Sequence, residues 1–156
     1  MNASTNKSTL IAMYRKCRGL TLVEILIALL VLSIGLLGLA ALQTTSLRFN
    51  TSSYYRTQAT ALAYDFADRM RANRQAALAD QYLVAFQDPP PACGANNVAG
   101  NVPQQDIASW RNALACRIPQ STGSIIRAGN EFTVIVRWDD SQGRQAPMQF
   151  AVTTAL

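Results

Sequence analysis

Glu24 is the residue whose position most needs a chemical explanation, because it is a carboxylate inside a long apolar segment. A charged side chain costs about 3 kcal/mol at the middle of a membrane and less near the end of a helix. The twelve Leu, Ile and Val residues within residues 25–42 favour insertion by about 4 to 7 kcal/mol in total. The segment can therefore enter a membrane with Glu24 in it, and Gly19 stands just before the segment begins.

Cys93 and Cys116 are the second candidate for chemistry, and we expect them to form one disulfide. The chain has three cysteines, of which Cys17 lies before the apolar segment. Two cysteines, Cys93 and Cys116, remain after the apolar segment. An even number of cysteines is typical of a disulfide if this part of the chain is exported. Closing a loop of about 24 residues stabilises a fold by about 3.4 kcal/mol on the chain-entropy model. A redox motif or a zinc site is a weaker alternative, because C-x-x-C and histidine are absent.

The remaining polar residues do not form a recognisable catalytic site. Histidine, the commonest general base and metal ligand, is absent. There is no glycine-rich phosphate loop and no cluster with metal-ligand spacing. Asp139 and Asp140 are adjacent, but neighbouring residues of a strand point to opposite faces, so they do not form a catalytic pair of carboxylates. We expect a solvated turn there, because they stand at the junction of a strand and a turn. We therefore predict that the protein is not an enzyme and has neither a cofactor nor a metal.

The net charge of +5 is unevenly distributed along the chain. The four basic residues before Gly19 are Lys7, Arg15, Lys16 and Arg18. From Leu20 onward ten arginines face nine acids, so no nucleic-acid groove and no direct nucleic-acid partner are predicted. Only Arg48 and Arg56 follow the apolar segment closely, and this bias predicts a cytoplasmic N-terminus.

The elements that must position these residues begin with a membrane-spanning helix over residues 20–42. These 23 residues would form a helix of about 34 Å, enough to cross a hydrocarbon core of about 30 Å. The competing interpretation is a cleaved secretory signal, with the sequence GLA at residues 38–40 as its cleavage site. Such a signal has an apolar core of about 7–15 residues without an acid, so the length of the segment and Glu24 disfavour it.

The helix is expected to continue beyond the membrane, because no glycine or proline occurs between Leu39 and Asp88. One apolar stripe is predicted there, consisting of Tyr55, Ala59, Leu62, Phe66 and Met70. We interpret the stripe as core packing, and we expect the helix to end near residues 74–79.

The C-terminal half predicts a small antiparallel sheet. Residues 88–103 have the composition of a loop, and residues 106–119 predict a short helix with Asp106 as its N-cap. Residues 131–140 alternate so that Phe132, Val134, Val136 and Trp138 share one face. Residues 123–129 and 147–155 can supply neighbouring strands. The predicted fold class is α+β, with one long helix packed on the sheet.

The sequence RGLTLVE at residues 18–24 resembles the leader junction of the type IV prepilins. In that family a short basic leader ends in glycine, a glutamate follows five residues after the cut, and an apolar segment comes next. The resemblance implies cleavage between Gly19 and Leu20 and N-methylation of Leu20 by a prepilin peptidase/N-methyltransferase, which would also remove Cys17. It implies that Glu24 pairs with the new terminal amine of a neighbouring subunit. In an ordinary anchor helix, Glu24 would instead be a first-turn acid that extends its carboxylate toward the membrane surface. Leu20 departs from the family's usual phenylalanine.

The sequences at residues 61–74 and 132–140 are similar to the PilV-type minor pilins. The resemblance implies three regions: a leader at 1–19, a transmembrane and filament-core helix at 20–42, and an amphipathic helix with an extracytoplasmic head at 43–156. Expected partners are other minor and major pilins, the inner-membrane pilus assembly platform and the lipid bilayer.

The predicted function is that of a minor pilin that takes part in initiating pilus assembly, with an indirect role in twitching motility, adhesion and DNA uptake. The protein would be an inner-membrane protein with a periplasmic head before it enters the pilus. The alternatives are a pseudopilin of a type II secretion system and an anchored periplasmic binding module that never polymerises.

Overall fold

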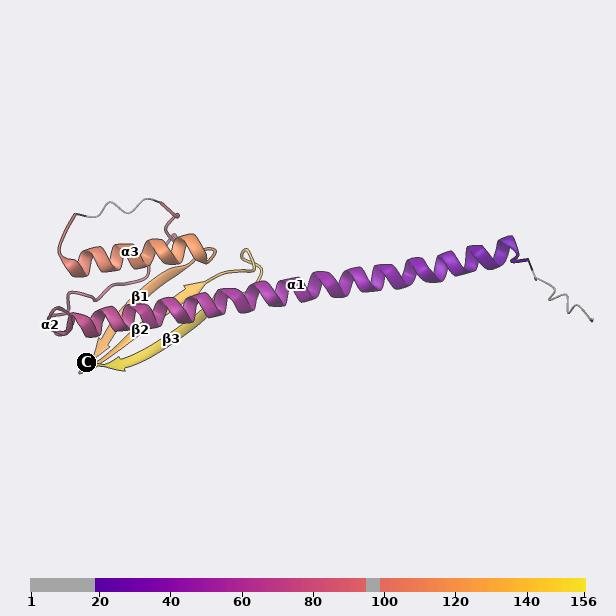
Figure 1. Cartoon of the computed structure of the whole chain (residues 1–156). Helices are drawn as coiled ribbons and strands as arrows, with labels where there is room; N and C mark the ends of the chain where they lie inside the picture. Colours follow the sequence, from indigo (N-terminus) through magenta and orange to yellow (C-terminus); the bar gives the residue numbers. More distant parts are fainter. Residues whose placement is uncertain (1–18, 95–98) are drawn as a thin grey trace, which may run out of the picture. The chain divides into compact units, whose positions relative to one another are not determined.

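The computed structural model describes residues 19–94 and 99–156, so the predictions for the basic leader and Cys17 lie outside it. The elements in chain order are α1 (Leu22–Ala72), α2 (Arg74–Leu78), α3 (Val102–Arg117), β1 (Thr122–Ala128), β2 (Glu131–Trp138) and β3 (Met148–Ala155) (Figure 1). The chain divides into two compact units, and the second unit begins at Thr45. The long N-terminal helix and the small antiparallel sheet confirm the predicted α+β fold class.

α1 is continuous through the polar segment that follows the apolar residues, although that segment is rich in Thr and Ser. Their hydroxyls donate hydrogen bonds to carbonyls one turn earlier, as from Thr44 to Ala40 at 3.0 Å and from Thr51 to Leu47 at 2.9 Å. The hydroxyls are thereby satisfied without ending the helix. The helix is also unbroken at Gly35 and Gly38.

The predicted stripe on α1 forms one side of the core of the second unit. Its buried members are Ala59, Leu62, Phe66 and Met70, with Tyr55 partly buried against them. The ring of Phe66 lies 4.6 Å from the ring of Trp110, measured between centroids. The indole N–H of Trp110 donates to the carbonyl of Leu62 at 3.0 Å, which satisfies a polar atom that the core would otherwise isolate.

The three strands form an antiparallel sheet in the order β1-β2-β3. The alternation predicted for β2 is confirmed, because Phe132, Val134, Val136 and Trp138 are all buried. Val134 pairs with Ile125 on one side and with Val152 on the other. Residues of one face thus align across the sheet, and the core lies between that face and the helices.

Gly123 in β1 is required where α3 packs closely on the sheet. A Cβ at this position would overlap the ring of Trp110 and lie 2.9 Å from Cδ1 of Leu114. We therefore expect Gly123→Ala to reduce the free energy of unfolding by about 1–3 kcal/mol through overpacking. Chemical denaturation of the whole chain in detergent measures this. Gly94→Ala is the control, since nothing lies within 4 Å of its added carbon, and equal stability of the two variants would contradict the prediction.

α1 ends at Ala72, slightly before the predicted interval of residues 74–79. The break falls at Asn73, whose backbone leaves the helical region with φ −119° and ψ 53°. Its side-chain amide donates to the hydroxyl of Tyr82 at 3.3 Å. The short helix α2 then occupies most of the interval in which the end was expected.

The prediction that Asp106 caps the second long helix is wrong. α3 begins at Val102, and its N-cap is Asn101. The side chain of Asn101 accepts a hydrogen bond from the N–H of Gln104 at 3.1 Å, and the side chain of Gln104 accepts one from the N–H of Asn101 at 3.2 Å. This reciprocal capping box outcompetes the later acid, and the loop predicted for residues 88–103 therefore ends at Asn101.

Asp106 instead joins α3 to α1 and to the segment after α2. Its carboxylate accepts a hydrogen bond from the hydroxyl of Tyr82 at 2.8 Å and pairs with Arg69 at 3.2 Å. Burial, followed by the hydrogen bond to Asp106, raises the pKa of Tyr82 above its ordinary value. The acid has a tertiary role that a capping pattern does not show.

Candidate processing and assembly site

Gly19 and Leu20 precede α1 and have no helical backbone. Both residues are exposed, and no atom lies within 4 Å of the position that a Cβ of Gly19 would take. A protease cleft must surround the scissile backbone closely, and a glycine without neighbouring atoms permits that approach. The predicted junction is thus sterically accessible in the described part of the chain.

Glu24 lies in the first turn of α1, where the helix dipole favours a negative charge. The backbone N–H of Glu24 donates to Oγ1 of Thr21 at 3.2 Å, so Thr21 caps the helix. The carboxylate is exposed, and within residues 19–94 and 99–156 no ion pair is formed by it. The charge is therefore accessible to a cation that another molecule supplies.

The apolar part of α1 has exposed side chains on all sides. Leu22 is 80% exposed and Leu37 is 72% exposed. The helix is long and apolar enough to cross a membrane, with a mean hydropathy of 2.9 over its most apolar window. A helix that is hydrophobic all round is stable in lipid or within a bundle rather than in water, which is consistent with a membrane-anchored protein.

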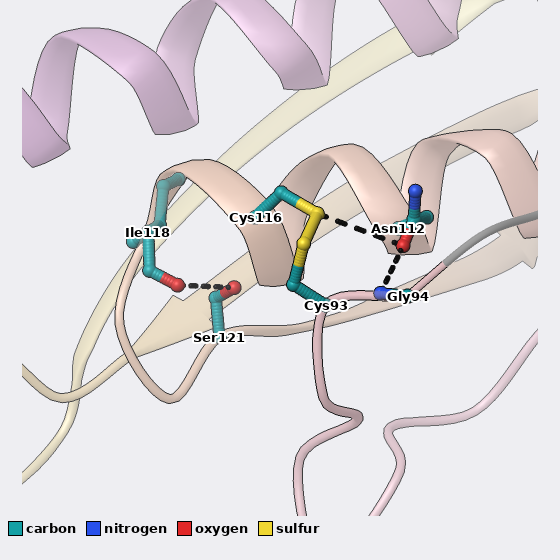
Figure 2. Close-up of a disulfide and its surroundings, with 6 residues drawn as sticks. All are labelled: Cys93, Gly94, Asn112, Cys116, Ile118 and Ser121. Carbon is teal, nitrogen blue, oxygen red and sulfur yellow. Dashed lines mark hydrogen bonds between the residues drawn. A yellow bond between two sulfur atoms is a disulfide. The ribbon is translucent and has the colours of Figure 1, made fainter.

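The predicted disulfide between Cys93 and Cys116 is present, with a Cα–Cα distance of 4.7 Å (Figure 2). It joins the loop that follows β-bridge residue Val84 to the last turn of α3. Oδ1 of Asn112 accepts a hydrogen bond from the N–H of Gly94 at 3.0 Å and lies 3.7 Å from the sulfur of Cys116. The loop is thus held to α3 at two adjacent points.

The adjacent acids Asp139 and Asp140 follow β2 at the start of a turn, and both are half-buried. Asp139 accepts hydrogen bonds from the backbone and hydroxyl of Ser141 at 2.7 and 2.6 Å, and from the N–H of Gly143 at 2.6 Å. The bonds from Ser141 are the main cause that lowers the pKa of Asp139. This arrangement organises a turn, and in the described residues no cluster of metal ligands accompanies it.

Arg111 on α3 is a residue that the sequence analysis did not single out. Its guanidinium donates to the carbonyl of Ala85 at 2.6 Å, and its Nε is buried without a hydrogen-bond partner among the described residues. Burial lowers its pKa. A single arginine in an amphipathic helix carries no sequence signal for this, because the surrounding loop is distant in sequence.

The comparisons with known proteins match the N-terminal region of the chain. Residues 14–40 match the family described as the prokaryotic N-terminal methylation motif. This match includes Gly19, Leu20 and Glu24, the residues chosen above from their types and spacing. No curated protein and no solved structure gives a significant match.

Proposed function

We propose that the chain is a minor pilin of a type IV pilus, on the premise that its N-terminal methylation motif supports a place in the type IV pilin superfamily. A motif of this kind implies processing by a prepilin peptidase and association with pilins. The family is structural rather than enzymatic. The observation that carries the proposal is the order of Gly19, Leu20 and Glu24 at the start of an exposed apolar helix.

In this proposal the peptidase cleaves between Gly19 and Leu20, and the new amine of Leu20 is methylated. The amine is cationic, and Glu24 is the acid closest to it in the chain. A bare amine and a bare carboxylate are both costly in lipid, and an ion pair between neighbouring subunits relieves both costs. Glu24 thereby selects helices that are in the correct register for assembly.

The disulfide supports a periplasmic location for the head before assembly. Disulfides persist in oxidising compartments such as the bacterial periplasm, and Cys93–Cys116 belongs to the second unit. Together with the basic leader, this favours an inner-membrane anchor with a cytoplasmic N-terminus. The chain would then leave the membrane for the pilus.

The PilV-type assignment, with a role in initiating assembly together with other minor pilins, is based on the resemblance of the head sequences. A pseudopilin of a type II secretion system would carry the same leader motif. Deletion of the gene separates the two roles. We expect loss of surface pili and of twitching motility with normal protein secretion, whereas loss of secretion with normal motility would assign the chain to the secretion system.

Mass spectrometry of the mature N-terminus tests the processing. We expect the protein isolated from the membrane to begin at Leu20 with one added methyl group, because the junction matches the prepilin motif. A preparation from cells lacking the prepilin peptidase is the control and should retain residues 1–19. A mature protein that begins near Ala41 would indicate conventional secretion and contradict the proposal.

A further inference from the structure

We propose that the head binds a carboxylate group in a shallow cavity between α3 and the disulfide-tethered loop. The cavity has a volume of about 390 Å³. Its lining residues are Gln87, Pro91, Ala92, Gln104, Ile107, Ala108, Arg111 and Asn112. This inference concerns the second unit alone and does not depend on the proposed function.

Two side-chain amides of the cavity have their oxygens already occupied. The oxygen of Gln104 accepts the N–H of Asn101 in the capping box, and the oxygen of Asn112 accepts the N–H of Gly94. Because the partners are backbone N–H groups, the orientation of each amide is determined by its hydrogen bond. The amide NH₂ groups of Gln104 and Asn112 are therefore the groups left over, and both are donors.

Arg111 adds a cation to these donors. Its hydrogen bond to the carbonyl of Ala85 holds the guanidinium in place, while its Nε–H has no acceptor among the described residues. Because this Nε is buried, a ligand in the cavity would meet the part of the guanidinium that lines it, and the Nε–H would respond to that ligand indirectly. Burial also opposes the charge of Arg111, and an anion beside it would offset that effect.

Among the residues that the structure describes around the cavity, no acid could satisfy Arg111 from within. None of the lining residues is Asp or Glu. Asp106, which is close to them in sequence, is already held by Arg69 and Tyr82. One cation accompanied by neutral donors matches a planar, singly charged acceptor, and guanidinium groups bind carboxylates through two parallel hydrogen bonds. A carboxylate is therefore the ligand class that this cavity fits.

The walls of the cavity are held together before any ligand arrives. The disulfide joins Cys93, which follows lining residues Pro91 and Ala92, to α3. The hydrogen bond from Gly94 to Asn112 adds a second link at the same place (Figure 2). A preformed site reduces the ordering cost of binding. The carboxylate could belong to a free small acid or to an Asp or Glu side chain of a peptide.

The test is a titration of the full-length chain in detergent, with ¹⁵N-labelled arginine observed by NMR. Three probes are used: sodium acetate, a capped peptide with a single glutamate, and the same peptide with glutamine. We expect the glutamate peptide to shift the Arg111 Nε–H signal saturably and the glutamine peptide to leave it unchanged. An equal response to acetate would identify a free carboxylate as sufficient, and a response to the peptide alone would identify a protein side chain.

Two isosteric variants remove donors while keeping the structural acceptors. Gln104→Glu retains the oxygen of the capping box, and Asn112→Asp retains the acceptor for Gly94. Each replaces an NH₂ donor by a negative oxygen, so each should weaken carboxylate binding by about tenfold or more. Arg117→Gln is the matched control, because this arginine lies on the same helix, is exposed and does not line the cavity; it should bind as the unaltered chain does.

Three results would overturn the inference. The first is an Arg111 signal that neither acetate nor the glutamate peptide moves. The second is an equal shift by the glutamine peptide, which would mean that charge is not recognised. The third is unchanged binding in both Gln104→Glu and Asn112→Asp, provided that their backbone spectra match that of the unaltered chain.

Discussion

Replacing Glu24 with alanine is expected to leave the chain processed and membrane-bound but to exclude it from pili. The helix remains apolar enough to insert, since the substitution only removes an unfavourable charge. The terminal amine of a neighbouring subunit then has no counter-ion in lipid. Loss of one partner of a buried ion pair costs about 3–5 kcal/mol, which corresponds to a decrease of more than about a hundredfold in association.

The measurement is the ratio of the protein in sheared pili to that in the inner-membrane fraction, determined by immunoblotting. Glu131→Ala is the matched control, because Glu131 is the other glutamate of the chain and is exposed at the start of β2. Glu24→Gln tests charge apart from shape and should behave as Glu24→Ala does. Normal incorporation of Glu24→Ala would contradict the assembly role and favour an anchored module that does not polymerise.

Removing the disulfide should cause the largest loss of stability in the head. The chain-entropy model gives about 3.4 kcal/mol for the loop that Cys93 and Cys116 close. A small domain has a total stability of only about 5–15 kcal/mol, so Cys93→Ser combined with Cys116→Ser would remove a substantial fraction. The free energy of unfolding is obtained by denaturing the whole chain in detergent and following tryptophan fluorescence, which Trp110 and Trp138 in the core provide.

The control for thiol chemistry is Cys17→Ser. Cys17 is the one cysteine outside the disulfide pair, and it precedes Gly19. Its replacement should therefore leave the processed protein unaffected. The double serine variant should also lose response in the carboxylate titration, because the tethered loop forms one wall of the cavity. Equal stability of the double variant and the unaltered chain would show that the loop is held by its other contacts alone.

Local patterns predicted the features that are near neighbours in sequence. Gly19, Leu20 and Glu24 were identified because their order and spacing resemble the type IV prepilin junction, and the family match covers the same residues. The alternation of residues 131–138 predicted the buried face of β2, because side chains of a strand alternate between faces regardless of what they pack against. The pairing of Cys93 with Cys116 was predicted because these two cysteines are the ones that follow the apolar segment.

The error at the start of α3 came from a local signal that was missed, and not from one that the sequence lacks. Asp106 and Asn101 are both good N-caps, and only Asn101 has Gln104 at the right spacing to complete the box. Asp106 instead forms an ion pair with Arg69 and accepts a hydrogen bond from Tyr82, and both residues are distant from it in sequence. The end of α1 at Ala72 was likewise placed by Asn73 and its contact with Tyr82.

The chain's own sequence thus determined its long apolar helix and its N-terminal methylation motif, because both depend on a short continuous segment. The tertiary structure alone decided the chemistry of the head. The donors of Gln104, Asn112 and Arg111 point to a carboxylate only because distant backbone groups occupy the other sides of these residues. The donors and acceptors that a side chain can offer a ligand are those not already hydrogen-bonded within the protein, and folding brings those internal partners together.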